Sequence, residues 1–160
     1  MDLAGYISQF GKIAYNSLEE GYSSSFKKTI LDSGQQNNKN IFAVRESLEE
    51  MTSRLQAKRA PKVVIIDSVQ YASITKLDYV AFRKKNPNTL MIFISHADGK
   101  KPEGRTANFI RYDSGVKIYV EGYKAMVTSR YGGNEDYIIW QDGADKYWGT
   151  SSIKKSNNDY

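Results

Sequence analysis

Two uninterrupted apolar runs constrain the fold of this chain more than any other feature. The first extends from Lys62 to Asp67 and has four consecutive apolar residues before its acid, and the second extends from Thr89 to Ser95. Neither run alternates with polar residues. Continuous apolar runs of this length are typical of strands that are buried on both faces in a parallel sheet.

Parallel strands need a crossover connection, and the segment between the two runs has the composition of a helix. The apolar residues expected on its buried side are Ile74, Leu77, Val80 and Ala81. Helix-covered parallel strands predict an α/β fold with right-handed crossovers. In such sheets ligands bind beyond the carboxyl ends of the strands, so the polar residues that follow each strand are the candidate functional residues.

The first 60 residues predict three helices and one strand. Helical spacing of apolar residues and glycine stops indicate helices over 3–10 and 23–33. A strand is expected over 13–18. Val44, Leu48, Met51 and Leu55 then form one apolar stripe, which predicts a third helix that Pro61 closes.

The pattern changes after residue 115, where apolar residues alternate with polar ones. Val116–Val120, Tyr123–Ser129 and Tyr137–Trp140 predict three strands, with a turn at Glu121–Gly122. We expect an antiparallel meander appended to the parallel sheet. Residues 150–160 are mostly Thr, Ser, Lys, Asn and Asp, which predicts a flexible polar tail.

Composition bounds the class of protein. The chain has 160 residues, of which 40% are hydrophobic and 3 are proline, and this is enough apolar material for one folded domain. The absence of cysteine excludes a disulfide framework and thiolate chemistry and favours a cytoplasmic location. No apolar run reaches the roughly 20 residues of a membrane span, so no membrane partner is expected. The net charge of +5 is compatible with a polyanionic partner.

Polar side chains follow three predicted strands at the edge where ligands bind. They are Glu19 and Glu20, Asp67 and Ser68, and Ser95 and His96. Each has a plainer explanation: Asp67 could cap whatever follows its strand, the glutamates could form a solvated turn, and His96 could be structural. Together, and in this order, they favour a catalytic edge.

This ordered set resembles the RecA-like ATPases, and within them the RadA-type and DnaB-type branch. Members show a strand ending in Glu, a magnesium-binding strand ending Ile-Asp-Ser-Ile-Gln or similar, and a strand ending in His or Gln. The resemblance covers roughly residues 2–142. Residues 129–135, Ser-Arg-Tyr-Gly-Gly-Asn-Glu, resemble the Lys-Asn-Arg-Phe-Gly segment of RadA, although Thr128 stands where that motif has lysine.

The resemblance implies a role for each residue. Glu19 or Glu20 would orient the attacking water, Asp67 with Ser68 would hold the magnesium of ATP, and His96 would sense the terminal phosphate. Arg130 would stabilise transition-state charge or contact DNA. The loop over 96–111 looks like the DNA-contacting loop of the family, with Lys100, Lys101, Arg105 and Arg111 as its cations. That loop could also be an ordinary solvated loop, and its Phe109 and Tyr112 could stack on bases or pack as a helix face.

One part of the family pattern is missing. No Gly-x-x-x-x-Gly-Lys-Ser/Thr phosphate-binding loop occurs, because Gly11-Lys12-Ile13 lacks the hydroxyl and Gly99-Lys100-Lys101 lacks the glycine spacing. The first strand of the family's sheet, which precedes that loop, is also absent. We therefore expect residues 1–149 to form an incomplete RecA-like core that binds ATP poorly by itself, with unpaired backbone groups where that strand would lie.

Three explanations remain open. The chain could be the C-terminal portion of a longer DNA recombination, repair or replication ATPase, which the retained acids favour. It could instead be a non-catalytic module that binds DNA or a partner, or a gene remnant. The family implies a homo-oligomeric ring or filament with nucleotide between subunits, and the exposed edges could alternatively cause a non-native dimer.

Overall fold

The structure, a computed structural model, describes residues 1–149 and divides them into two compact units. The first unit comprises Met1–Ile110, and the second begins at Arg111. The predicted polar tail, residues 150–160, lies outside the described residues.

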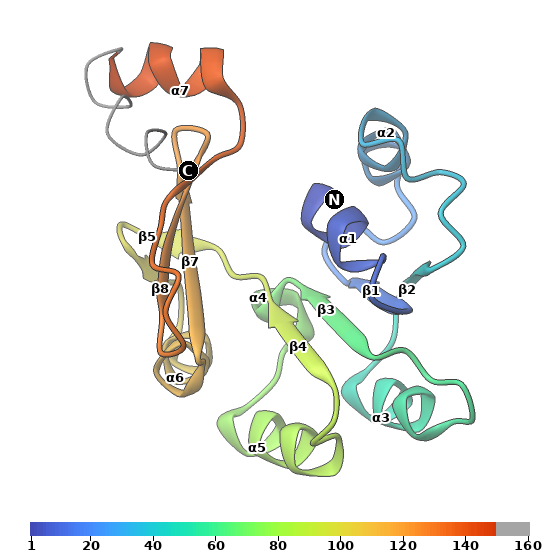
Figure 1. The fold of residues 1–160 in the computed structure, drawn as a ribbon. Coiled ribbons are helices and arrows are strands. Elements are labelled where there is room, and N and C mark those ends of the chain that lie inside the picture. The colour runs from blue at the N-terminus through green and yellow to red at the C-terminus, as the bar shows by residue number, and fades with distance from the viewer. Residues whose placement is uncertain (150–160) are drawn as a thin grey trace. The chain divides into compact units, whose positions relative to one another are not determined.

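A four-stranded parallel sheet organises the first unit, in the order β2-β1-β3-β4 (Figure 1). Its strands are β1 (Ile13–Ser17), β2 (Ile41–Val44), β3 (Val63–Asp67) and β4 (Leu90–Phe93). Every residue of β1 is buried, as are the first four residues of β3. The prediction of an α/β fold around a mainly parallel sheet is therefore confirmed.

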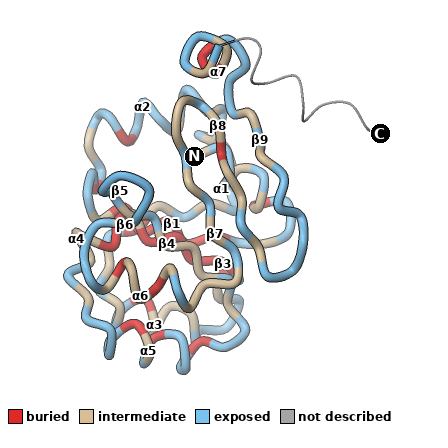
Figure 2. The backbone as a smooth tube through the Cα atoms, turned by 90° about the vertical axis from the view of Figure 1, so that its left-hand side faces the viewer, coloured by how far each residue is buried: buried red, intermediate tan, exposed pale blue. Residues whose placement is uncertain are grey.

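Helices cover both faces of this sheet (Figure 1). They are α1 (Asp2–Ile7) and α2 (Ser24–Asp32) on one face and α3 (Leu48–Gln56) and α5 (Lys76–Lys85) on the other. Side chains alternate between the two faces, so Tyr15 and Ile65 pack with Phe26 of α2, whereas Val64 and Ile66 pack with Met51 of α3. Figure 2 shows that burial is concentrated along the central strands.

Capping residues in the sequence fix where helices α2, α3 and α5 begin. The Ser23 hydroxyl accepts a hydrogen bond from the Phe26 N–H at the start of α2. Reciprocal capping boxes begin the other two, with Ser47 and Glu50 at α3 and Thr75 and Asp78 at α5. Such caps satisfy backbone N–H groups that a helix leaves without internal partners.

Three short elements and one longer helix follow the strands of the sheet. They are α4 (Val69–Ala72), directly after β3, the antiparallel pair β5 (Ala97–Asp98) and β6 (Lys101–Pro102), and α6 (Arg105–Asp113). Ala107 and Ile110 of α6 are buried against Val69 and Tyr79. This packing anchors the start of α6 to the first unit.

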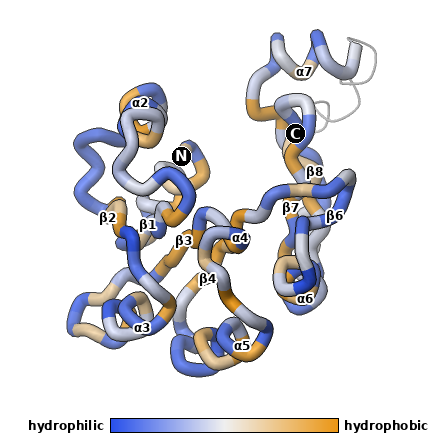
Figure 3. The backbone as a smooth tube through the Cα atoms, turned by 180° about the vertical axis from the view of Figure 1, so that it is seen from behind, coloured by the Kyte–Doolittle hydropathy of each residue, from blue (hydrophilic) through white to orange (hydrophobic). Residues whose placement is uncertain are grey.

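The second unit contains a separate three-stranded antiparallel sheet and one helix. Its elements are β7 (Val116–Glu121), β8 (Lys124–Ser129), β9 (Tyr137–Ile138) and α7 (Gln141–Trp148). Figure 3 shows the apolar stretches of β7 and β8. Gly122 and Tyr123 both have positive φ, as a two-residue hairpin of type I′ requires. A Cβ atom at position 122 would collide with Tyr147 of α7, so this position of the turn requires glycine.

The meander is thus confirmed, but it forms its own sheet instead of extending the parallel one. Two other expectations are wrong in detail, and neither β2 nor α7 was predicted. Val44 ends strand β2 and does not belong to α3. The crossover helix buries Tyr79 and Phe82, whereas Leu77 is 80% exposed. Ile74 and Val80 are partly buried, so apolar spacing identified only part of the buried side of that short helix.

Strand β4 also differs from the expectation of burial on both faces. It pairs only with β3 among residues 1–149, and Leu90 at its start is exposed. Edge position explains this, because the outer side of an edge strand has no neighbouring strand to cover it. The described residues therefore leave one side of β4 open for backbone pairing.

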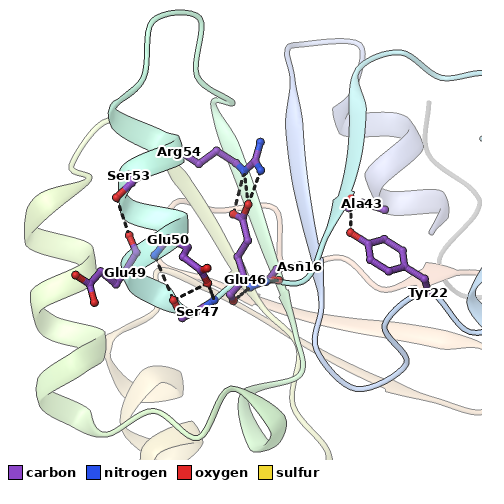
Figure 4. A network of polar contacts seen from close by, with 9 residues as sticks. All are labelled: Asn16, Tyr22, Ala43, Glu46, Ser47, Glu49, Glu50, Ser53 and Arg54. Atoms are coloured by element: carbon purple, nitrogen blue, oxygen red, sulfur yellow. Dashed lines mark hydrogen bonds and ion pairs between the residues drawn. The ribbon is translucent and has the colours of Figure 1, made fainter.

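A buried amide ties β1 to the entry of α3 (Figure 4). Asn16 is fully buried, its side-chain N–H donates to the carbonyl of Glu46 at 2.8 Å, and its Oδ1 accepts from the Glu46 N–H at 2.8 Å. The Glu46 carboxylate in turn receives the guanidinium of Arg54 on α3. Asn16 thus fixes the segment between β2 and α3 against the centre of the sheet.

Replacing Asn16 with alanine should therefore destabilise the first unit. Asn16→Ala leaves both backbone groups of Glu46 without their partner, which costs about 2 kcal/mol of unfolding free energy. Urea denaturation of the full chain measures this. Asn37 is exposed, so Asn37→Ala is the matched control and should change the free energy of unfolding little. Equal effects of the two substitutions would contradict the anchoring role of Asn16.

Candidate functional site

The parallel register brings three strand ends to one edge of the first unit. Ser17 at the end of β1 is the direct neighbour of Asp67 at the end of β3, and Ile66 lies beside Phe93 of β4. The Asp67 carbonyl also accepts hydrogen bonds from the N–H groups of Leu18 and Glu19, at 2.7 and 3.2 Å. Residues just beyond these ends consequently face a common space.

The Asp67 carboxylate is held by a buried tyrosine. The Tyr15 hydroxyl donates to Asp67 Oδ2 at 2.6 Å, and the Tyr15 ring packs against Phe26 with ring centroids 5.5 Å apart. Burial raises the pKa of the Tyr15 hydroxyl, and the hydrogen bond to Asp67 raises it further, so Tyr15 stays protonated and acts as the donor. Among residues 1–149, no other hydrogen bond to this carboxylate is present.

The plainer explanation of Asp67 as a cap does not hold. The N-cap residue of α4 is Ser68, and no side chain caps that helix. The peptide bond between Asp67 and Ser68 is cis. The second carboxylate oxygen of Asp67 is not fully buried, because every fully buried side-chain oxygen among residues 1–149 has a hydrogen-bond partner and this one has none.

Glu19 is the acid that the structure brings into contact with the other predicted site residues. Its Oε2 lies 2.9 Å from His96 Nε2 and accepts a hydrogen bond from the Ser68 hydroxyl at 3.3 Å. Ser68 is completely buried, whereas Glu19 and His96 are about one-third and two-fifths exposed. Glu20 is exposed, and its side chain makes no hydrogen bond in the described residues.

The contact between Glu19 and His96 raises the pKa of His96 above its ordinary value of 6.5. The hydrogen bond to Glu19 is the main cause, and the negative charges of Glu19, Glu103 and Asp67 add to it, against a smaller effect of partial burial. The imidazolium form is therefore favoured beside Glu19.

Three residues that sequence reasoning did not select complete the edge. One is Tyr15, and the others are Gln70 and Glu103. Gln70 Nε2 donates to the Ser95 hydroxyl at 2.9 Å and to the Glu103 carbonyl at 2.8 Å, and its Oε1 accepts from the His96 N–H at 3.2 Å. The Glu103 N–H donates to the His96 carbonyl at 2.8 Å.

These bonds close the base of the β5–β6 hairpin on His96. The sequence did carry a signal for Gln70, because the Ile-Asp-Ser-Ile-Gln segment of the family ends in glutamine at this position. Tyr15 and Glu103 carried no signal in the sequence. Asp67, the partner of Tyr15, is 52 positions away, and His96, the partner of Glu103, lies across the β5–β6 hairpin.

The predicted nucleic-acid residues lie elsewhere on the chain. Lys100 and Lys101 are exposed at the β5–β6 turn, and Arg105 is exposed at the start of α6, not in a loop. Arg111, also on α6, lies 5.9 Å from the Tyr112 ring. Phe109 packs edge-on against Tyr79, which favours its packing role over base stacking.

Arg130 belongs to the second unit and is held there by its own neighbours. Its guanidinium donates to the Tyr112 carbonyl at 2.7 Å, and its N–H donates to the Gly115 carbonyl at 2.9 Å.

The donor set fits a magnesium ion held with phosphates better than a protein-only metal cage. Residues 1–149 contain no group of three or more His, Cys, Asp or Glu side chains placed to hold a metal. Mg²⁺ is commonly bound by one or two carboxylates together with substrate phosphates and water. Asp67, with one oxygen that is not fully buried, offers one such carboxylate.

Comparisons with known proteins give no family for the chain. No protein-family model matches the sequence, and no curated protein matches it. No helix among the described residues has the length and apolar character of a membrane span. The cytoplasmic location stays a prediction.

The raised pKa of His96 can be measured directly. We expect its imidazole to titrate above pH 6.5, and Glu19→Gln to lower the pKa because the charged acceptor is lost. The ion pair then stabilises the fold fully below pH 6.5, and this contribution is lost as pH rises through the folded-state pKa. NMR of the His96 Cε1 proton measures the pKa. Glu20→Gln is the matched control, and an equal shift in both variants would contradict the pairing with Glu19.

Proposed function

We propose that the first unit carries the carboxylate side of a RecA-like nucleotide-hydrolysis site, in which Glu19 orients water and Asp67 with Ser68 serves the magnesium of ATP. The observation that carries this proposal is the convergence of three strand ends on one carboxylate. Glu19 Oε2 contacts both His96 from the end of β4 and Ser68 from the end of β3. This is the order of roles that the family resemblance implies.

The geometry supports different roles for the two carboxylate oxygens of Glu19. Its Oε2 is engaged by His96 and Ser68, so the other oxygen is left to accept a proton from an attacking water. His96 fixes the orientation of the carboxylate and would link it to the hairpin whose base it shares. When bound, Mg²⁺ would neutralise charge on the phosphates, and Asp67 would hold it.

The proposal includes the missing phosphate cradle. The 160 residues lack a phosphate-binding loop, so the chain itself should bind nucleotide weakly. A second segment would have to supply that loop for hydrolysis at a useful rate. ATP and Mg²⁺ are the proposed cofactors of the completed site, and assembly into a ring or filament is part of the same proposal.

Weak, magnesium-dependent nucleotide contact at this edge is the expected result for the chain as it stands. Titration of the ¹⁵N-labelled chain with Mg²⁺ and a non-hydrolysable ATP analogue should shift the amide signals of Glu19, Asp67 and His96. The affinity should be in the millimolar range, about −4 kcal/mol. Asp67→Asn should abolish the shifts, whereas Asp32→Asn on the exposed end of α2 should leave them. Shifts confined to other residues, or none at all, would refute the assignment.

DNA binding by the β5–β6 hairpin is the second candidate function. The observation in its favour is that Lys100, Lys101 and Arg105 are all exposed and that none forms an ion pair within residues 1–149. Asp98 and Glu103 lie nearby and reduce the local positive charge. This function requires no nucleotide, so it also serves a non-catalytic module.

Replacing these three cations with alanine together should weaken DNA binding and its salt dependence. Each lost phosphate contact lowers the slope of log affinity against log salt by about 0.7 for a single strand, so the slope should fall by about 2. Fluorescence anisotropy with a labelled oligonucleotide measures both quantities. A triple variant of the exposed Lys27, Lys39 and Lys84 removes the same charge elsewhere and should change binding less. Identical behaviour of both variants would exclude the hairpin as the contact surface.

A further inference from the structure

The outer edge of β4 presents backbone groups without hydrogen-bond partners. β4 is the outermost strand of the parallel sheet (Figure 1). The Ile94 N–H donates to the Ile66 carbonyl of β3 at 2.9 Å, and the direction of the backbone groups alternates along a strand. The N–H and C=O groups of Met91 and Phe93 therefore point away from β3. No hydrogen bond to these groups is present among residues 1–149.

The opposite edge of the sheet, β2, is better protected. Its Ile41 N–H donates to the Asn38 carbonyl at 3.2 Å, and its Ala43 carbonyl accepts from the Tyr22 hydroxyl at 3.5 Å. The exposed Arg45 follows the strand directly. Charged side chains and occupied backbone groups are means by which edge strands avoid pairing with another chain. β4 lacks both, since positions 89–95 contain neither a charged residue nor a proline.

Apolar side chains also lie along this edge. Leu90 is 52% exposed and Ile94 is 38% exposed, and by alternation they share one face of the sheet with the partly buried Ile92. An occupant of the edge must therefore be an extended strand that carries apolar side chains at alternate positions. Residues 150–160 do not meet this requirement, because Ile153 is their one aliphatic residue.

A second copy of β4 meets the requirement when it lies antiparallel, with the two Ile92 residues opposite each other. Met91 of one copy then faces Phe93 of the other, and each such pair exchanges two backbone hydrogen bonds. All four outward backbone groups of each copy are used. The same register sets Leu90 beside Ile94 of the other copy, which makes an apolar cross-strand pair at each end.

We infer that β4 is a self-pairing edge, through which two copies of the chain join their parallel sheets across a two-fold axis. The interface is isologous, because the same strand serves both copies. The inference does not rest on the proposed nucleotide site. Self-pairing uses the backbone groups that any other strand at this edge would need, so the dimer excludes the addition of another strand there.

Sedimentation velocity of the full chain, without nucleotide, tests the association itself. A series of protein concentrations should show an equilibrium between monomer and dimer. The contact of one short strand is smaller than a standard interface, so the dissociation constant should be micromolar or weaker. A chain that stays monomeric up to millimolar concentration, or that forms larger assemblies without a dimer, would overturn the inference.

Two double variants test the register. Leu90→Lys with Ile94→Lys sets like charges opposite each other at both ends of the pairing and should weaken dimerisation by about tenfold. Leu90→Lys with Ile94→Glu sets opposite charges at the same places and should restore most of the affinity at low salt. Equal dimerisation of these two variants would refute the register, because a general effect of substitution does not depend on the sign of the second charge.

A matched control adds the same charge elsewhere. Leu31 on α2 and Leu77 on α5 are exposed, so Leu31→Lys with Leu77→Lys should leave dimerisation nearly unchanged. A loss as large as that of Leu90→Lys with Ile94→Lys would show that net charge, and not β4 pairing, controls the association.

Amide hydrogen exchange of the wild-type chain detects the same contact and covers the case in which the β4 variants do not fold. The Ile94 N–H is bonded to β3 within each copy, so its exchange should be slow at every protein concentration. The Met91 and Phe93 N–H groups are bonded only in the dimer, so they should exchange fast in dilute solution and slowly in concentrated solution. Exchange of these two amides that does not depend on concentration would contradict the inference, even if a dimer forms.

Discussion

The parallel pairing of β1 with β3 is the constraint on which the first unit depends. These two strands occupy the middle of the sheet, and nearly all of their side chains are buried. Their register sets Ser17 beside Asp67, and through it Glu19, Ser68 and the Tyr15 hydroxyl share one edge. A shift of one residue would move every side chain of β1 to the opposite face and separate these groups.

The candidate site is built from both the interior and the surface of this sheet. Tyr15 holds Asp67 from the buried side, whereas His96 holds Glu19 from the exposed side. The two contacts have different physical consequences. A bond made from a packed core fixes geometry, since the ring has no room to move, and a bond near solvent between charged groups responds to pH. This edge of the sheet therefore combines Asp67, whose carboxylate is held rigidly, with Glu19, whose partner His96 titrates.

The open side of β4 and the missing phosphate-binding loop bear on the same proposal. β4 offers backbone groups for pairing, and the sequence offers no cradle for phosphates. A nucleotide site of the proposed kind needs both a loop and the strand that delivers it. The basic hairpin is independent of that requirement, because exposed cations attract a polyanion without any nucleotide.

The sequence by itself determined three of the four parallel strands, β1, β3 and β4, and the acids after β1 and β3. Continuous runs such as Val63–Ile66 have few alternatives to a buried strand, and serine or threonine with an acid three residues later starts a helix locally. Only the tertiary structure decided which face of α5 is buried, that β4 is an edge, and that Glu19 and not Glu20 meets His96. The Tyr15–Asp67 bond spans 52 positions of the chain. Contacts of that kind follow from strand order and register, which no local pattern of residues encodes.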